Sequence, residues 1–172
     1  LVAESSLSFI DGDAGKLIYR GYTIDDLARN ASFEEVVYLL WHGELPNATE
    51  LSDFKSSMAE ERHINDDVQR LVRDLAEADE EPMAALRTIV SDLSAYDPDA
   101  DADPTAEAAN PRKGRRITAT IPTALAALSR IRAGDAPVAP RQDLDPASTF
   151  LYIIHDEEPD DVLSETFDMA LV

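Results

Sequence analysis

Apolar side chains recur every three or four residues over most of this chain, a spacing that places them on one face of an α-helix. Polar and proline-containing stretches at 97–111 and 134–145 interrupt the pattern and are expected to be loops. The spacing predicts helices over 24–30, 33–42, 48–61, 66–78, 83–96, 115–133, 146–154 and from about 158 to 172.

The segment 6–22 instead has the pattern of two short β-strands. Residues 7–10 and 17–19 are mostly apolar and flank 11–15, which is rich in the Asp and Gly that hairpin turns use. The predicted fold class is therefore all-α, with an N-terminal β-hairpin at 6–22 followed by a multi-helix bundle from about 24 to 172.

Local signals mark some of these boundaries. Ser32 and Glu35 form a capping box ahead of helix 33–42, and Gly43 is a typical helix stop. Pro122 lies inside 115–133, where its missing N–H predicts a kink.

Acidic residues outnumber basic ones by 35 to 15, which gives a formal net charge of -20. Such a charge repels nucleic-acid phosphates and anionic lipid, so we expect no nucleic-acid and no membrane partner. No apolar run approaches the roughly 18 residues of a membrane span, no signal peptide opens the chain, and cysteine is absent. We expect a cytoplasmic globular protein.

Lysine is scarce: three residues, against twelve arginines. An acidic, lysine-poor surface suits concentrated salt, because the screening length falls to about 3 Å at 1 M and carboxylates then repel one another less. We interpret the composition as halophilic; the alternative is an acidic protein from ordinary salt.

Asp11, Asp13 and Gly15 resemble the start of a calcium-binding loop. An EF-hand needs Gly at the sixth position and a carboxylate at the twelfth, which here are Lys16 and Tyr22. A hairpin turn is therefore the preferred interpretation of this segment.

Other metal-ligating residue types are present without a metal-binding pattern. Four aspartates alternate over 97–103 without a Gly turn, which favours a solvated acidic loop. His42, His63 and His155 are far apart in the sequence, and two of them suit helix C-termini. The sequence therefore identifies no metal ligand.

A basic cluster stands out against the acidic background. Arg112, Lys113, Arg115 and Arg116 come together near the start of helix 115–133. Arginine side chains and helix N-termini both bind phosphate oxygens, so a phosphate-bearing ligand is one hypothesis. The other is internal pairing with the acidic loop 97–103.

The last predicted helix carries an apolar stripe made of Val162, Leu163, Phe167, Ala170 and Leu171. No Gly, Asn or basic residue follows to end it. We therefore expect the chain to be part of a longer protein.

Specific motifs then follow one another along the chain: I-D-G at 10–12, Y-R-G-Y at 19–22 and L-W-x-G-x-L-P at 40–46. Further matching segments are P-M at 82–83, I-T-A-x-I-P at 117–122 and E-T-F-D-M-A-L-V at 165–172. With these motifs the chain resembles the N-terminal portion of citrate synthases, of the archaeal and bacterial type that includes 2-methylcitrate synthases. The acidic, lysine-poor variant resembles the enzyme of salt-loving archaea.

The resemblance implies that 1–172 is the N-terminal part of the citrate synthase large domain. It implies a homodimer that packs through helices near 83–96 and 115–133 and that condenses acetyl-CoA with oxaloacetate to citrate and CoA. Acetyl-CoA is then a substrate, and no cofactor is expected. Whether Arg112, Lys113, Arg115 or Arg116 contacts CoA is left open.

In this family one His and one Asp act on the acetyl methyl carbon, a second His donates to the oxaloacetate carbonyl, and arginines clamp the dicarboxylate. His42, His63 and His155 match none of those positions, so no catalytic, cofactor-binding or metal-binding residue is assigned. An inactive fragment of a citrate synthase is the first hypothesis. A stand-alone interaction module, or one subunit of a split citrate or 2-methylcitrate synthase, is the second.

The composition predicts that folding depends on salt. Circular dichroism should show helicity and thermal resistance rising between low and molar salt, because screening removes repulsion among the carboxylates. Equal helicity and equal heat resistance at both salt concentrations would contradict the halophilic interpretation.

Overall fold

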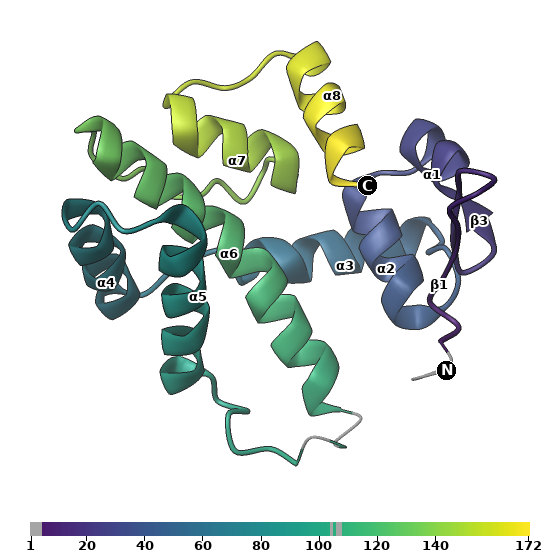
Figure 1. Ribbon diagram of the computed structural model, residues 1–172, viewed down its shortest axis with the longest axis horizontal. Coiled ribbons are helices and arrows are strands. Elements are labelled where there is room, and N and C mark those ends of the chain that lie inside the picture. The colour runs from purple at the N-terminus through teal and green to yellow at the C-terminus, as the bar shows by residue number, and fades with distance from the viewer. Residues whose placement is uncertain (1–4, 104, 106–107) are drawn as a thin grey trace. The chain divides into compact units, whose positions relative to one another are not determined.

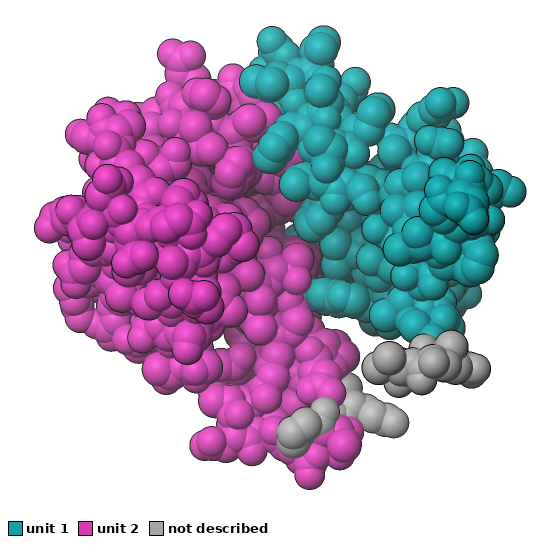
Figure 2. Space-filling model, viewed as in Figure 1, with its two compact units in different colours: residues 1–55, 160–172 teal, residues 56–159 magenta. Residues whose placement is uncertain are grey.

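The computed structural model describes residues 5–103, 105 and 108–172, and its contacts divide the chain into two compact units. Unit 1 consists of residues 1–55 with 160–172, and unit 2 of residues 56–159 (Figure 2). The described residues form eight α-helices and a small sheet, so the protein is mainly α-helical, as predicted. The assignment of 1–172 to one part of a single large domain stays a prediction.

Unit 1 begins with a small antiparallel sheet of β1 (Ser8–Asp11), β2 (Lys16–Tyr19) and β3 (Tyr22–Thr23), in that order. Residues Phe9 and Ile10 pair with Ile18 and Leu17 respectively, so the hairpin at 6–22 is confirmed. The third strand was not predicted, because two residues are too few to show a strand pattern.

A tight turn at Arg20 and Gly21 joins β2 to β3. The φ angles are 48° and 97°, and two positive φ angles are what a two-residue type I′ hairpin turn requires. Arg20 also connects the sheet to the helices of this unit, since its Nη2 donates to the carbonyl oxygen of Leu40 at 3.1 Å.

The helices of unit 1 are α1 (Ile24–Asn30), α2 (Phe33–His42), the first part of α3 (Ala48–Glu60) and α8 (Asp161–Leu171). The predicted capping box of α2 is present, and Gly43 ends the helix in the left-handed conformation. The core of α1 and α2 consists of Leu27, Val36 and Leu39, with Tyr19, Ala31, Leu40, Leu45 and Val172 packed against it.

Helix α8 is anchored to α2 by a carboxylate. The backbone N–H of Phe33, in the first turn of α2, donates to both oxygens of Asp168 at 3.2 and 3.1 Å. A negative charge is favourable there, because the helix dipole leaves the N-terminus positive. The apolar stripe of α8 is largely exposed, with Val162 at 73% and Leu163 at 45%.

Unit 2 is built around α6 (Ala109–Ala133), which packs against α4 (Asp66–Glu77), α5 (Pro82–Leu93) and α7 (Pro146–His155). Figure 1 shows α6 running between α7 on one side and α4 with α5 on the other. A short 3₁₀ turn, Ser94–Tyr96, follows α5. The main buried cluster comprises Ile64, Val68, Val72, Ala76, Ala85, Ile89, Ala124, Ala127 and Leu128.

The predicted start of α6 at residue 115 is wrong by six residues, and the loop expected over 97–111 is correspondingly shorter. The error arose because Pro111 was assigned to the loop, although proline is tolerated in the first turn of a helix. Residues 104, 106 and 107 of the loop lie outside the described residues. The helix continues through Pro122, and the kink there stays a prediction.

The inner surface of α6 consists mostly of small residues, with Leu128 as a large aliphatic residue among them. The buried side chains include Ala119, Ala124, Ala126, Ala127, Thr120 and Thr123. By contrast Ile117 is 39% exposed, and Ile121 and Leu125 are half-buried. Small side chains let neighbouring helices approach closely, because the interaxial distance depends on the residues at the contact.

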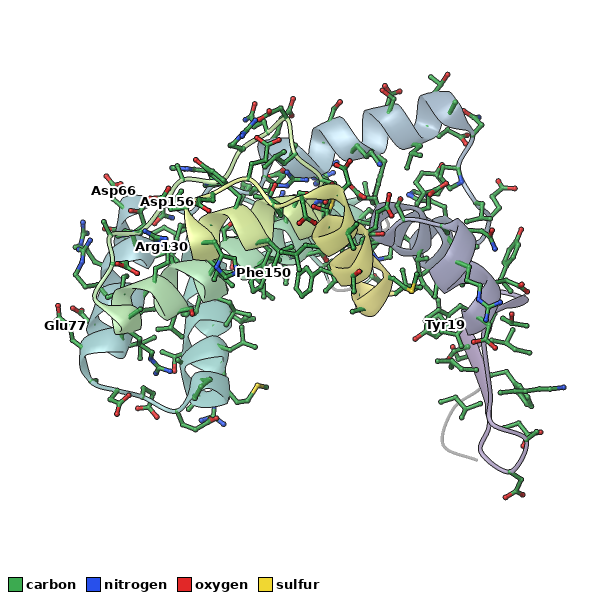
Figure 3. The ribbon with its side chains drawn as sticks, turned by 90° about the horizontal axis from the view of Figure 1, so that it is seen from above. Tyr19, Asp66, Glu77, Arg130, Phe150 and Asp156 are labelled. Atoms are coloured by element: carbon green, nitrogen blue, oxygen red, sulfur yellow. The ribbon has the colours of Figure 1, made fainter. Side chains whose placement is uncertain are left out.

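Two buried arginines fix the irregular segment 134–145 between α6 and α7. The Nη1 of Arg62 lies within hydrogen-bond distance of the carbonyl oxygens of Arg141 and Leu144, at 3.0 and 2.6 Å. Arg130 donates to the carbonyl oxygens of Ala136 and Ile154, and pairs with Asp156, beside which it lies in Figure 3.

The close packing of α6 predicts a strong effect of added volume. Ala124→Leu should lower the free energy of unfolding by roughly 1–3 kcal/mol, because Ala124 is fully buried and the extra methyl groups have no space. Ala133→Leu, the same change at the exposed end of α6, is the control and should stay within about 0.5 kcal/mol. Denaturant unfolding in molar salt measures both, and equal effects would contradict the packing argument.

Candidate functional site

Arginine and aspartate side chains form a network where the first turns of α6 meet the segment after the 3₁₀ turn. The guanidinium of Arg112 donates to both oxygens of Asp99, with Nε at 3.0 Å. The Nη2 of Arg116 donates to Asp97 and to Asp99, the latter at 2.6 Å. Arg112 and Arg116 are four residues apart and so lie on one face of the helix.

This network perturbs the ionisation of the Asp99 carboxyl. Hydrogen bonds from Arg112 and from Arg116 hold the pKa of Asp99 well below its usual range. Asp97 also accepts the backbone N–H of Asp99 at 2.7 Å, which fixes the turn that presents both carboxylates to the helix.

The third arginine of the cluster pairs elsewhere in unit 2. Arg115 lies 3.6 Å from the carboxylate of Glu61, whose own carbonyl oxygen accepts the hydroxyl of Thr120 at 3.1 Å. The predicted pairing with the acidic loop 97–103 is therefore confirmed for Arg112 and Arg116, whereas Arg115 pairs with Glu61 outside that loop. Glu61 was missed because nothing in the sequence connects it to a residue 54 positions later.

Lys113 differs from its neighbours. It is half-buried, and within the described part of the chain no carboxylate lies within ion-pair distance of its ammonium group. A pocket opens beside it, between α5, α6 and residues 61–65.

The acidic segment 97–103 is only partly the solvated loop that was predicted. The side chains of Asp97 and Asp99 are largely shielded by their arginine partners, whereas Asp101 and Asp103 are exposed. Hydrogen bonds from Thr105 lower the pKa of Asp103. The loop differs from the prediction because α6 begins earlier than predicted, and its first turns bring Arg112 within reach of the loop.

The histidines occupy ordinary structural positions. His42 and His155 are the last residues of α2 and α7, as expected, and the ring of His42 stacks near that of Tyr38 with centroids 4.1 Å apart. His63 is exposed and borders the pocket beside Lys113. None of the three is brought to a metal-binding cluster, since the described residues contain no group of three or more suitable ligands.

Asp11 belongs to the hairpin turn, as predicted. Its Oδ1 accepts the backbone N–H of Ala14 at 3.0 Å, and Gly15 has a φ of 63°, which suits a glycine in a turn. In the described part of the chain, no helix combines the length and the apolar character that crossing a membrane requires.

The depressed pKa of Asp99 gives a prediction about stability and pH. Asp99→Asn should lower the thermal midpoint at neutral pH by roughly 2–4 °C. A carboxyl whose pKa is lowered on folding stabilises the folded state when the pH is above the pKa of the unfolded chain. This contribution is lost as the pH falls from that value through the pKa of the folded state. The difference between the variant and the original should therefore shrink below about pH 4.

Asp101→Asn is the matched control, because Asp101 is exposed in the same loop. It should leave the midpoint nearly unchanged at every pH. If both variants behave alike, the network contributes nothing measurable and its structural role is refuted.

Comparisons with known proteins agree with this architecture. The family described as "Citrate synthase, C-terminal domain" matches residues 1–172. A citrate synthase of Haloferax volcanii is 58% identical over 100% of this chain and 46% of its own length. "Citrate synthase 2" of Bacillus subtilis is 44% identical over 100% of the chain and 45% of its own length.

The solved structures agree as well. The crystal structure of citrate synthase from Pyrobaculum aerophilum superposes with a TM-score of 0.88 at 36% identity, over 99% of this chain and 44% of that one. The chain thus spans less than half the length of the relatives it matches. It belongs to the citrate synthase family.

Proposed function

We propose that the protein to which this chain contributes condenses acetyl-CoA with oxaloacetate and releases citrate and CoA. The observation that carries the proposal is the family match over all 172 residues, together with the close superposition on a citrate synthase structure. The chain would supply the N-terminal helical scaffold of such an enzyme.

The catalytic groups of the proposed reaction would lie in the remaining half of the enzyme. Making an enol from the acetyl methyl group needs a positioned base and a donor to the thioester oxygen, and the dicarboxylate needs fixed cations. The cations of the basic cluster do not form such a clamp, since three of the four are already paired with carboxylates of this chain. We therefore propose that residues 1–172 alone do not catalyse the condensation.

A homodimer that packs through α5 and α6 is part of the proposal. Met83 on α5 is 66% exposed, and the large aliphatic residues Ile121 and Leu125 of α6 are half-buried. Apolar groups gathered on two adjacent helices are typical of an interface between subunits.

The remaining proposals concern the environment of the protein. A net charge of -20 with three lysines supports a halophilic protein, and a cytoplasmic location is in keeping with the proposed metabolic role. The choice between acetyl-CoA and propionyl-CoA depends on an acyl pocket that the proposal places in the other half of the enzyme.

A chimera tests the function. Residues 1–172 would replace the matching segment of the Haloferax volcanii citrate synthase, and thiol release from acetyl-CoA would be followed with and without oxaloacetate. We expect oxaloacetate-dependent turnover by the chimera, a dimer in sedimentation, and background thiol release by residues 1–172 alone.

A well-folded, dimeric chimera without activity would contradict the proposed function. Turnover by residues 1–172 alone that His155→Ala abolishes would show instead that this chain carries its own catalytic residue. Full activity on mixing residues 1–172 with a separate second half would favour a split synthase over a fragment.

A further inference from the structure

A pocket of about 330 Å³ lies within unit 2, between α5, α6 and the segment that precedes α4. Its apolar wall consists of Ile64, Val90, Leu93 and Ile117. Known small-molecule sites of proteins have volumes of about 300–1,000 Å³ and mostly apolar walls with a few polar groups, so this pocket suits a small ligand.

Both cations and carboxylates line the pocket, together with neutral polar side chains. Lys113 and Arg116 contribute cations from one side of α6, and His63 and Tyr96 contribute an imidazole and a phenol. Tyr96 and Ile117 are both substantially exposed, so the apolar edge of the pocket is open to solvent.

The carboxylates that border the pocket are already engaged. Glu61 pairs with Arg115, and Asp97 pairs with Arg116, which also binds Asp99. Lys113 is left as a half-buried ammonium without a charged partner among the described residues. Counting Arg112, which also binds Asp99, these three carboxylates have three arginine partners, and the charge left over beside the pocket is that of Lys113.

We propose that this pocket binds a small organic anion, a compact apolar group bearing one carboxylate. The carboxylate would pair with Lys113, and the apolar group would cover the wall formed by Val90, Leu93 and Ile117. An inorganic anion would leave that wall in water, and the volume is too small for a much larger molecule.

The net charge of the protein does not prevent such binding at high salt. With a screening length of about 3 Å at 1 M, only the ammonium within contact distance acts appreciably on the ligand. This site is separate from the proposed condensation and would stand if that proposal failed, because its test measures binding alone.

Phenylacetate is a suitable probe, because it combines one carboxylate with an apolar ring of the right size. We expect saturable binding to the chain by isothermal titration calorimetry in molar salt. Amide resonance shifts should be confined to residues around the pocket, including Lys113 and Tyr96. Phenylacetamide, which has the same shape without the charge, should bind about tenfold or more weakly.

Substitutions at Lys113 and at Lys16 test whether the ammonium of Lys113 binds the ligand. Lys113→Met should weaken phenylacetate binding about tenfold or more, and Lys113→Arg should restore most of it. Lys16→Met removes the same charge from the exposed strand β2 in unit 1 and should change nothing. Absence of saturable binding, equal binding of the amide, or an unaffected Lys113→Met variant would each overturn the proposal.

Discussion

The small side chains on the inner surface of α6 are the constraint on which the helical part of unit 2 depends. Ala124, Ala126 and Ala127 are almost completely buried, and α4, α5 and α7 all pack against this one helix. Because alanine adds little volume, three helices can approach the same central one, and Ile117, Ile121 and Leu125 of α6 are left nearer the surface.

Arginine side chains make the hydrogen bonds that hold the irregular segments against these packed helices. Arg62 and Arg130 bind backbone carbonyls of the irregular segment after α6, and Arg116 binds two aspartates of the segment after α5. A guanidinium has five donors in a planar arrangement and can satisfy several acceptors at once, which an ammonium does less well. Several of the few cations of this acidic chain thus hold loops in place, while most carboxylates remain at the surface.

The pairing of arginines with carboxylates also bears on which residues are free to bind a ligand. The arginines of the basic cluster on α6 already have carboxylate partners within this chain, and the family relationship accounts for the fold. The features that could bind other molecules are the exposed apolar residues on α5, α6 and α8, and Lys113 beside a pocket. We propose that a partner subunit binds at α5 and α6 and that a small ligand binds beside Lys113.

The sequence by itself determined the mainly helical class, the hairpin, most helix bounds and the family. Periodicity, the capping box at Ser32 and the turn residues at 11–15 act locally, so they can be read without knowing the fold. The sequence also suggested both explanations of the basic cluster, phosphate binding and internal pairing, without choosing between them.

Only the tertiary structure showed that Arg112 and Arg116 pair with the acidic loop. The two-residue strand β3, the early start of α6, the pairing of Arg115 with Glu61 and the anchoring of Phe33 by Asp168 all escaped prediction. Each of the two pairings joins residues that are distant in sequence, 54 and 135 positions apart. Their distances are set by helix packing, and a one-dimensional pattern carries no information about which helix faces which.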